Sequence, residues 1–290
     1  MSGADVGRLV LLAAVWGLAF VFIRVAVMPL GPVVLVELRQ VIAGVALALY
    51  ARSIGLSLEV RRRWRVYLPV ALLNSALPFV LVAAAQRELA ASYAAILVST
   101  SPLLAALISA VALDDPLTPR KLGGLVLGIA GVALLIGWNP AALDLPPVWA
   151  IAAVLAAALL YAIAGVYTRI RARDIPPLAT AAASQLASAG LVLPFVALAP
   201  PAAMPGAVEW LSVLALALFS SALAFILYFQ LIRNVGPVKT LTVNFLAPLF
   251  GVGGGALLLG ERITANMLGG TVVILAGTAL VLGGARPRPG

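Results

Sequence analysis

Three charged side chains interrupt the long apolar stretches near the start of this sequence: Arg24, Glu37 and Arg39. A charge inside hydrocarbon is costly, so such residues are functional candidates by default. Arg24 lies six residues before Leu30, the middle of a predicted hairpin, and Glu37 lies seven residues after it. We therefore expect Arg24 and Glu37 at matching depths in a membrane, where they can form an ion pair.

Two kinds of role fit these charges. The functional interpretation is an outer gate, or an anchor for the carboxylate of a substrate. The structural alternative is an ion pair that only holds helices together, or an arginine that extends to the membrane surface. Glu37 and Arg39 are two residues apart, which is about 200° around a helix. These two side chains therefore cannot both face one cavity.

The composition excludes most other chemistry. Of the 290 residues, 63% are hydrophobic and 10% are charged, and the chain has no histidine and no cysteine. Soluble domains carry about 25% charged residues, so this chain is expected to be a membrane protein. Histidine-based acid–base catalysis and thiolate metal sites are excluded, and no clustered acid/base set is visible. We expect no enzymatic activity, no cofactor and no metal.

Ten apolar segments are long enough to cross a bilayer as helices, which takes about 20 residues each. With the N-terminus in the cytoplasm, the cytoplasmic segments hold 15 of the 19 Lys and Arg residues, and the outer segments hold only Arg87 and Arg262. This asymmetry predicts a multi-pass protein of the bacterial inner membrane with both termini cytoplasmic. It also explains the net charge of +9 without a nucleic-acid partner. The segments are 9–28, 33–51, 66–85, 92–113, 121–138, 148–168, 177–198, 210–232, 238–259 and 265–284.

The chain contains an internal repeat. Residues 75–137 align without gaps to residues 221–283, and 20 of the 63 positions are identical. The division predicted is a first repeat over 1–140 and a second over 141–290, each with five helices. Because five is odd, the second half enters the membrane from the opposite side. Such inverted repeats are typical of secondary transporters, with a substrate site at midplane and alternating access. The non-transport alternatives are a membrane receptor and a structural helical bundle.

Several short motifs occur in the same order in both halves. In this respect the chain resembles the drug/metabolite transporter superfamily, in its ten-helix EamA-type branch, and looks most like YddG-type aromatic amino-acid exporters. The resemblance implies a basket of helices around a central cavity, lined by the first four helices of each half. The motifs are Trp16-Gly17 leading to Arg24, Pro32 leading to Arg39, Pro102-Leu103-Leu104, Asp114-Asp115-Pro116-Leu117-Thr118 with Gly123-Gly124, Pro248-Leu249-Phe250, and Leu259-Gly260-Glu261-Arg262-Ile263-Thr264 with Gly269-Gly270.

Aromatic, polar and proline residues at depth complete the candidate site. Trp16 and Tyr161 are repeat partners on the first helix of each half, and Trp16, Phe20 and Arg24 share one helix face. Packing against lipid or other helices is the alternative for the aromatic residues, and helix–helix hydrogen bonding for the polar ones. Bends at Pro102 and Pro248 would suit gating. The candidate cavity residues are Trp16, Phe20, Asn74, Ser75, Pro78, Tyr161, Gln185, Ser221, Phe225, Tyr228 and Asn244.

The predicted substrate follows from these side chains. Neutral donors and acceptors with aromatic walls suit a zwitterionic metabolite, whereas a sugar phosphate would need clustered deep Lys or Arg. With the resemblance, this predicts export of neutral, aromatic amino acids. The alternatives are lipophilic cationic drugs, which only Glu37 could neutralise, and other metabolites. The expected partners are the small-molecule substrate and membrane lipid, and monomer and homodimer both remain open. Both proton coupling and uniport fit the sequence.

Overall fold

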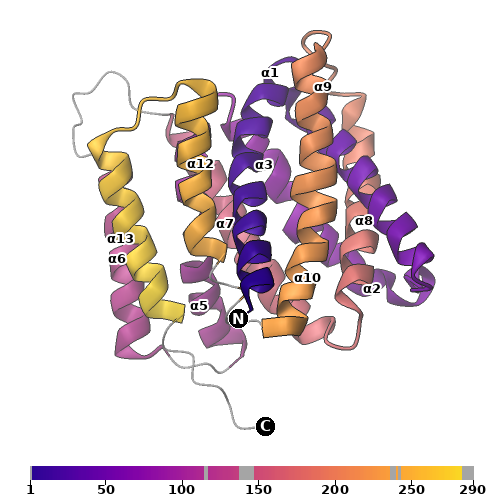
Figure 1. The fold of residues 1–290 in the computed structure, drawn as a ribbon, viewed down its shortest axis with the longest axis horizontal. Helices are drawn as coiled ribbons and strands as arrows, with labels where there is room; N and C mark the ends of the chain where they lie inside the picture. The colour runs from indigo at the N-terminus through magenta and orange to yellow at the C-terminus, as the bar shows by residue number, and fades with distance from the viewer. Residues whose placement is uncertain (1, 114–116, 137–146, 236–239, 241–242, 283–290) are drawn as a thin grey trace.

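The computed structural model describes residues 2–113, 117–136, 147–235, 240 and 243–282, and all the regular elements in this part of the chain are helices (Figure 1). Helices suit an apolar chain because each backbone N–H and C=O is bonded within its own segment. The elements are α1 (Gly3–Ser53), α2 (Val60–Ala71), η1 (Leu72–Ala76), α3 (Leu77–Ala85), α4 (Ala91–Val98), α5 (Ser101–Ala112), α6 (Pro119–Ile136), α7 (Val148–Arg171), α8 (Pro177–Val196), α9 (Ala207–Leu214), η2 (Ala215–Leu223), α10 (Ala224–Val235), α12 (Val243–Leu259) and α13 (Ala265–Leu282).

The first helix folds back on itself. α1 spans 51 residues, but Gly31 inside it has φ 72° and ψ 164°, which is not helical. Glycine adopts positive φ without a steric penalty, and the flanking Pro29 and Pro32 each remove a backbone donor. Figure 1 shows the two legs, one rising from the N-terminus and one descending from the hairpin. We call the end of the bundle near the N-terminus the N-terminal face, and the end at Gly31 the hairpin face.

The helices have the length and hydropathy of a multi-pass membrane protein. Eight of the helical runs in the described residues are long and apolar enough to cross a bilayer, the two-legged α1 among them. α12, with 17 residues, is a shorter apolar helix. The all-α membrane class predicted from the sequence is confirmed at this level. The Asp114, Asp115 and Pro116 positions of the predicted motif lie outside the described residues.

The internal repeat is visible in the element boundaries. α6 runs from Pro119 to Ile136, and adding 146 to both numbers gives the bounds of α13, Ala265–Leu282. The π-helical segment η1, at 72–76, corresponds in the same way to 218–222, which lies inside the second π-helical segment, η2. π-Helical turns are rare and occur often at functional sites. Because they recur at the same repeat position, η1 and η2 mark a candidate functional region of the bundle.

α6 and α13 pack closely along a stripe of glycines. A Cβ on Gly124 would lie 2.6 Å from the carbonyl oxygen of Gly277, and a Cβ on Gly277 would lie 2.5 Å from that of Gly124. Gly131 and Gly270 are opposed in the same reciprocal way. As the position rises in one helix it falls in the other, so the two helices are antiparallel. The glycine stripe of α6 therefore serves helix packing within the chain. Close approach of helices is the usual role of spaced small residues in membrane helices.

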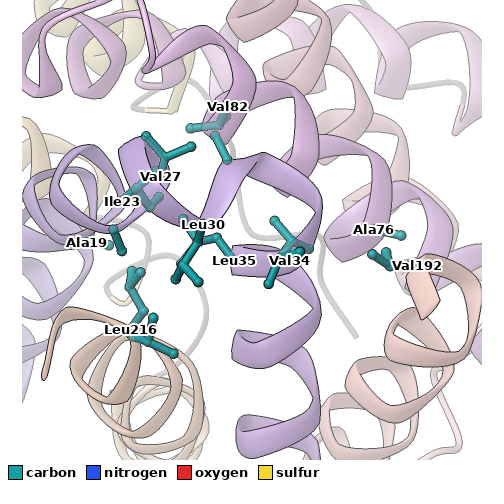
Figure 2. Close-up of a cluster of buried hydrophobic side chains, with 14 of the residues drawn as sticks. Ala19, Ile23, Val27, Leu30, Val34, Leu35, Ala76, Val82, Val192 and Leu216 are labelled. Atoms are coloured by element: carbon teal, nitrogen blue, oxygen red, sulfur yellow. The ribbon is translucent and has the colours of Figure 1, made fainter. Parts of the chain in front are cut away.

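A buried apolar cluster joins both halves next to the hairpin. It includes Leu30 from α1, Ala76 from η1, Val192 from α8 and Leu216 from η2 (Figure 2). At the hairpin face, the backbone N–H groups of Ala202 and Ala203 both donate to the carbonyl of Pro29, at 2.8 and 3.2 Å. These contacts join the α1 hairpin to the segment that follows α8.

Candidate functional site

Arg39 is the centre of the candidate site. Its side chain lies on the second leg of α1 and the residue is 7% exposed. Arg39 Nε donates to Ser221 Oγ at 3.0 Å, and its guanidinium carbon lies 4.0 Å from the centre of the Phe79 ring. Among the described residues, no carboxylate lies within the 4.0 Å that defines a salt bridge to this arginine. A buried cation held by a hydroxyl and an aromatic face can still accept an anionic partner.

Two aromatic pairs cross between the halves of the sequence. The rings of Trp16 and Tyr228 are 5.7 Å apart, and those of Phe79 and Tyr161 are 6.3 Å apart and edge to face. Trp16 and Tyr161, the predicted repeat partners, each pack on an aromatic residue of the opposite half. The Phe79 ring contacts both Tyr161 and Arg39, so one aromatic pair forms part of the arginine site.

The predicted ion pair between Arg24 and Glu37 is not formed. Arg24 instead donates to the backbone carbonyl of Gln86, and Gln86 Nε2 donates to the carbonyl of Phe20 at 2.8 Å. Glu37 is 8% exposed, and its Oε2 has no hydrogen-bond partner among the described residues. Arg24 is therefore satisfied by a backbone carbonyl 62 residues further along the chain. The matching depth of Arg24 and Glu37 in the sequence pattern does not reveal this contact.

The polar residues divide into two groups. Ser221 binds Arg39, whereas Ser75, its repeat partner, is 1% exposed and has no hydrogen-bond partner in the described chain. Gln185, also 1% exposed, has neither amide atom paired with a described residue. Asn74 and Asn244 are half-buried. The arginine site is thus assembled, while buried polar groups elsewhere at this depth remain unsatisfied.

The remaining predicted residues occupy structural positions. Phe225 packs on a cluster that includes Leu47 and Ala222. Pro78 is buried directly after η1, and Pro102 begins α5 where α4 has ended. Pro248 lies inside the continuous helix α12. The helix therefore changes character at two of these three prolines, as expected for residues without a backbone donor.

Sequence reasoning missed two side chains that complete these contacts, and it gave no partner for Glu261 of the second-half motif. Phe79 had a usable signal, since its repeat partner Phe225 was predicted and Phe79 was not. Gln86 had none, because only the fold brings it to Arg24 and Phe20. Glu261 accepts hydrogen bonds from the backbone N–H groups of Ala91 and Ser92, at 2.6 and 3.0 Å. A carboxylate at the start of α4 also interacts favourably with the helix dipole.

A cavity of about 330 Å³ opens at the N-terminal face, lined by residues of both halves. At its edge Arg63 Nη1 lies 2.5 Å from Asp174 Oδ2. The hydrogen bond from Arg63 holds the pKa of Asp174 below its ordinary value. Hydrogen bonds to the ionised form of a carboxyl lower its pKa, so this contact is made by charged partners at neutral pH.

A family model for the EamA-like transporter family matches this chain twice, over residues 8–137 and 148–283. The chain belongs to the EamA-like transporter family. The two matches fall on the two halves of the repeat, and membership identifies the protein as a membrane transporter and not an enzyme. The receptor and structural-bundle alternatives are thereby set aside.

The chain is also similar to two bacterial transporters over nearly the whole length of each protein. The chain is 28% identical to the uncharacterized inner membrane transporter YedA of Escherichia coli strain K12, covering 96% of this chain and 90% of that protein. It is 25% identical to the uncharacterized transporter YoaV of Bacillus subtilis strain 168, covering 91% of each. A solved crystal structure with 22% identity superposes with a TM-score of 0.69 over 97% of this chain and 96% of the other, which supports the fold.

Proposed function

We propose that this EamA-like transporter exports neutral amino acids, the aromatic ones in particular, across the inner membrane by alternating access. In this proposal Arg39 binds the substrate carboxylate. The Phe79–Tyr161 and Trp16–Tyr228 pairs form apolar walls for the side chain. No cofactor takes part. The YddG-type resemblance supports the substrate, and family membership supports transport.

The observation that carries the proposal is the state of Arg39. An ionised group in a low-dielectric site is costly unless it is paired, and Arg39 has no carboxylate partner among the described residues. Its hydrogen bond to a described residue uses Nε, so the two terminal nitrogens can form a bidentate pair with a carboxylate. An amino acid supplies that group, and its own ammonium keeps the transported molecule neutral overall.

The aromatic pairs support the choice of side chain. Each pair consists of one ring from the first half and one from the second. A planar substrate bound between the two pairs would therefore contact both halves at once. Aromatic rings prefer edge-to-face or offset neighbours at 4.5–7 Å. A site built between two halves is also what alternating access needs, because relative motion of the halves then opens one side and closes the other.

The proposed topology is ten spans in a five-plus-five inverted repeat, divided near residue 140. Counting the two legs of α1 separately and including α12 gives ten apolar crossings. The antiparallel packing of α6 and α13 supports inversion, since these helices are repeat partners. The distribution of Lys and Arg supports cytoplasmic termini, and the similarity to the inner membrane transporter YedA supports the location.

A cationic lipophilic compound is the second candidate substrate. Buried Glu37 favours it, because its Oε2 has no partner among the described residues and could bind a cation. A cation would bind Glu37 and would not need Arg39. An amino acid would bind Arg39 through its carboxylate, so substitution of Arg39 distinguishes the two candidates.

Counterflow in proteoliposomes separates them. Phenylalanine, phenylpropanoate, which lacks the ammonium, and phenethylamine, which lacks the carboxylate, are offered as labelled solutes. We expect uptake of phenylalanine and none of phenethylamine. Arg39→Gln should abolish phenylalanine counterflow, and Arg39→Lys, which keeps the charge but loses the planar fork, should reduce its affinity by about tenfold. Uptake of phenethylamine that survives Arg39→Gln would transfer the assignment to cations.

A further inference from the structure

Glu37 is a buried carboxyl that the binding of an amino-acid carboxylate does not use. It lies on the second leg of α1 and is 8% exposed, with Oε2 unpaired among the described residues. No arginine or lysine of the described chain lies within 4.0 Å of its carboxylate. An ionised carboxylate in such a place would lack the partner that burial requires. A neutral, protonated carboxyl is compatible with the same surroundings.

The neighbourhood of Glu37 offers polar groups but no countercharge. Gln40 is one turn away on the same helix face, fully buried, with neither amide atom paired in the described part of the chain. Gly44 continues this face and packs on Leu186 of α8, which fixes the face against that helix. An amide can donate to a carboxylate or accept from a protonated carboxyl, so Gln40 can serve both forms.

The other charges near this leg are accounted for. Of the elements that pack on α1, α3, α4, α8, α12 and η2 contain no Asp, Glu, Lys or Arg. α9 contributes only Glu209, near its start, and α10 contributes only Arg233, near its end. Arg39 binds Ser221, and Arg24 binds the carbonyl of Gln86. Tyr93 of α4 also has a buried hydroxyl without a partner in the described chain, but Glu37 is the carboxyl group of this region without a fixed partner among the described residues.

We propose that Glu37 is the proton-binding site that couples transport to the proton gradient. The proposal rests on the amino-acid export proposed above. The Glu37 carboxylate takes a proton from the outer side and releases it to the cytoplasm while one amino acid moves outward. No bond other than the O–H bond of the carboxyl forms or breaks. Arg39 and Glu37 lie on opposite faces of one helical leg that hinges at Gly31, so its motion can act on both sites together.

The repeat fixes the stoichiometry. The second half has alanine at both 182 and 183, the positions that correspond to Glu37 in the two registers the repeat allows. There is thus one such carboxyl in each chain. One proton per neutral amino acid makes each cycle carry one positive charge inward. It also limits the substrate gradient to about tenfold for each pH unit when the membrane potential is clamped at zero.

The test compares gradient-driven accumulation with counterflow in proteoliposomes of the wild type and Glu37→Gln, which mimics the protonated carboxyl. We expect a one-unit pH gradient to drive about tenfold accumulation of phenylalanine by the wild type. Glu37→Gln should lose this accumulation. Because the protonated form binds phenylalanine more weakly when binding releases the proton, its counterflow should need higher phenylalanine concentrations but persist at saturation. Glu88→Gln, which changes an exposed carboxyl, is the matched control and should behave as the wild type.

A second measurement needs no vesicles. Phenylalanine added to the detergent-solubilised wild type in weak buffer should release protons, detected with a pH indicator, and Glu37→Gln should release none. Accumulation by Glu37→Gln equal to the wild type, or wild-type accumulation driven by a sodium gradient and not by a pH gradient, would overturn the proposal. Loss of counterflow by the wild type itself would instead count against amino-acid export.

Discussion

At the residue scale, the molecule separates a cation from an acid that lie two positions apart in sequence. Arg39 faces Ser221 and the Phe79 ring, while Glu37 remains without a described partner. The helical period made this separation predictable, since neighbours at i and i+2 point to opposite sides. The partners were not predictable, because only tertiary packing brings Ser221 to Arg39 and Gln86 to Arg24.

The two cross-half aromatic pairs are testable one residue at a time. We expect Trp16→Ala and Tyr161→Ala each to lower phenylalanine counterflow more than they lower protein yield, because each removes an aromatic contact of about 0.5–1.5 kcal/mol and one wall of the site. Transport is measured at equal amounts of purified protein. Normal counterflow by both variants would assign the two rings to packing alone.

At the scale of elements, the repeat predicted more than the hydropathy did. The apolar segments located the helices to within a few residues, but they gave no indication of η1 and η2. The 146-residue offset relates these two segments once one of them is known. Individual bends were less predictable, because Pro78, Pro102 and Pro248 have the same chemistry and yet Pro248 lies inside the continuous helix α12.

The α6–α13 contact gives a matched pair of substitutions. A methyl group on Gly277 would lie 2.5 Å from the Gly124 carbonyl oxygen, whereas Gly123 has open space around its Cβ position. We expect Gly277→Ala to cost about 1–3 kcal/mol of stability, as overpacking does. Gly123→Ala should be neutral or stabilising, because alanine favours the helix. Thermal unfolding of both variants in detergent measures the difference, and equal melting temperatures would contradict the packing described.

At the scale of the whole molecule, orientation is open to a direct test. The chain has no native cysteine, so single cysteines report without background. In intact cells, a cysteine at Arg171 should be shielded from an impermeant thiol reagent, and one at Ala203 should react, because the Lys and Arg bias predicts that the N-terminal face is cytoplasmic. The reverse labelling pattern would invert the topology and exchange the inner and outer sides assigned to Glu37.

The Arg63–Asp174 contact ties the two halves together at the N-terminal face. The pKa of Asp174 is lowered from 3.8 by the hydrogen bond from Arg63, so the stability it contributes is fully present above pH 3.8 and is lost as the pH falls through the lowered value. Asp174→Asn should therefore lower the melting temperature by the same amount at pH 7 and pH 5. High salt should shrink this difference, since both groups are partly exposed. If the difference in melting temperature disappeared already at pH 5, the Asp174 carboxylate could not be its source.

The reciprocal glycine contacts between α6 and α13 have a further consequence. Gly124 meets Gly277 as Gly270 meets Gly131, and these residues are exchanged in pairs by the 146-residue offset. An interface in which each surface meets its own copy is what a two-fold symmetric homodimer has. The contact between α6 and α13 within this single chain therefore has the symmetry of a homodimer interface. Away from this contact the two halves differ in single residues, and Glu37 is one for which the second half has alanine.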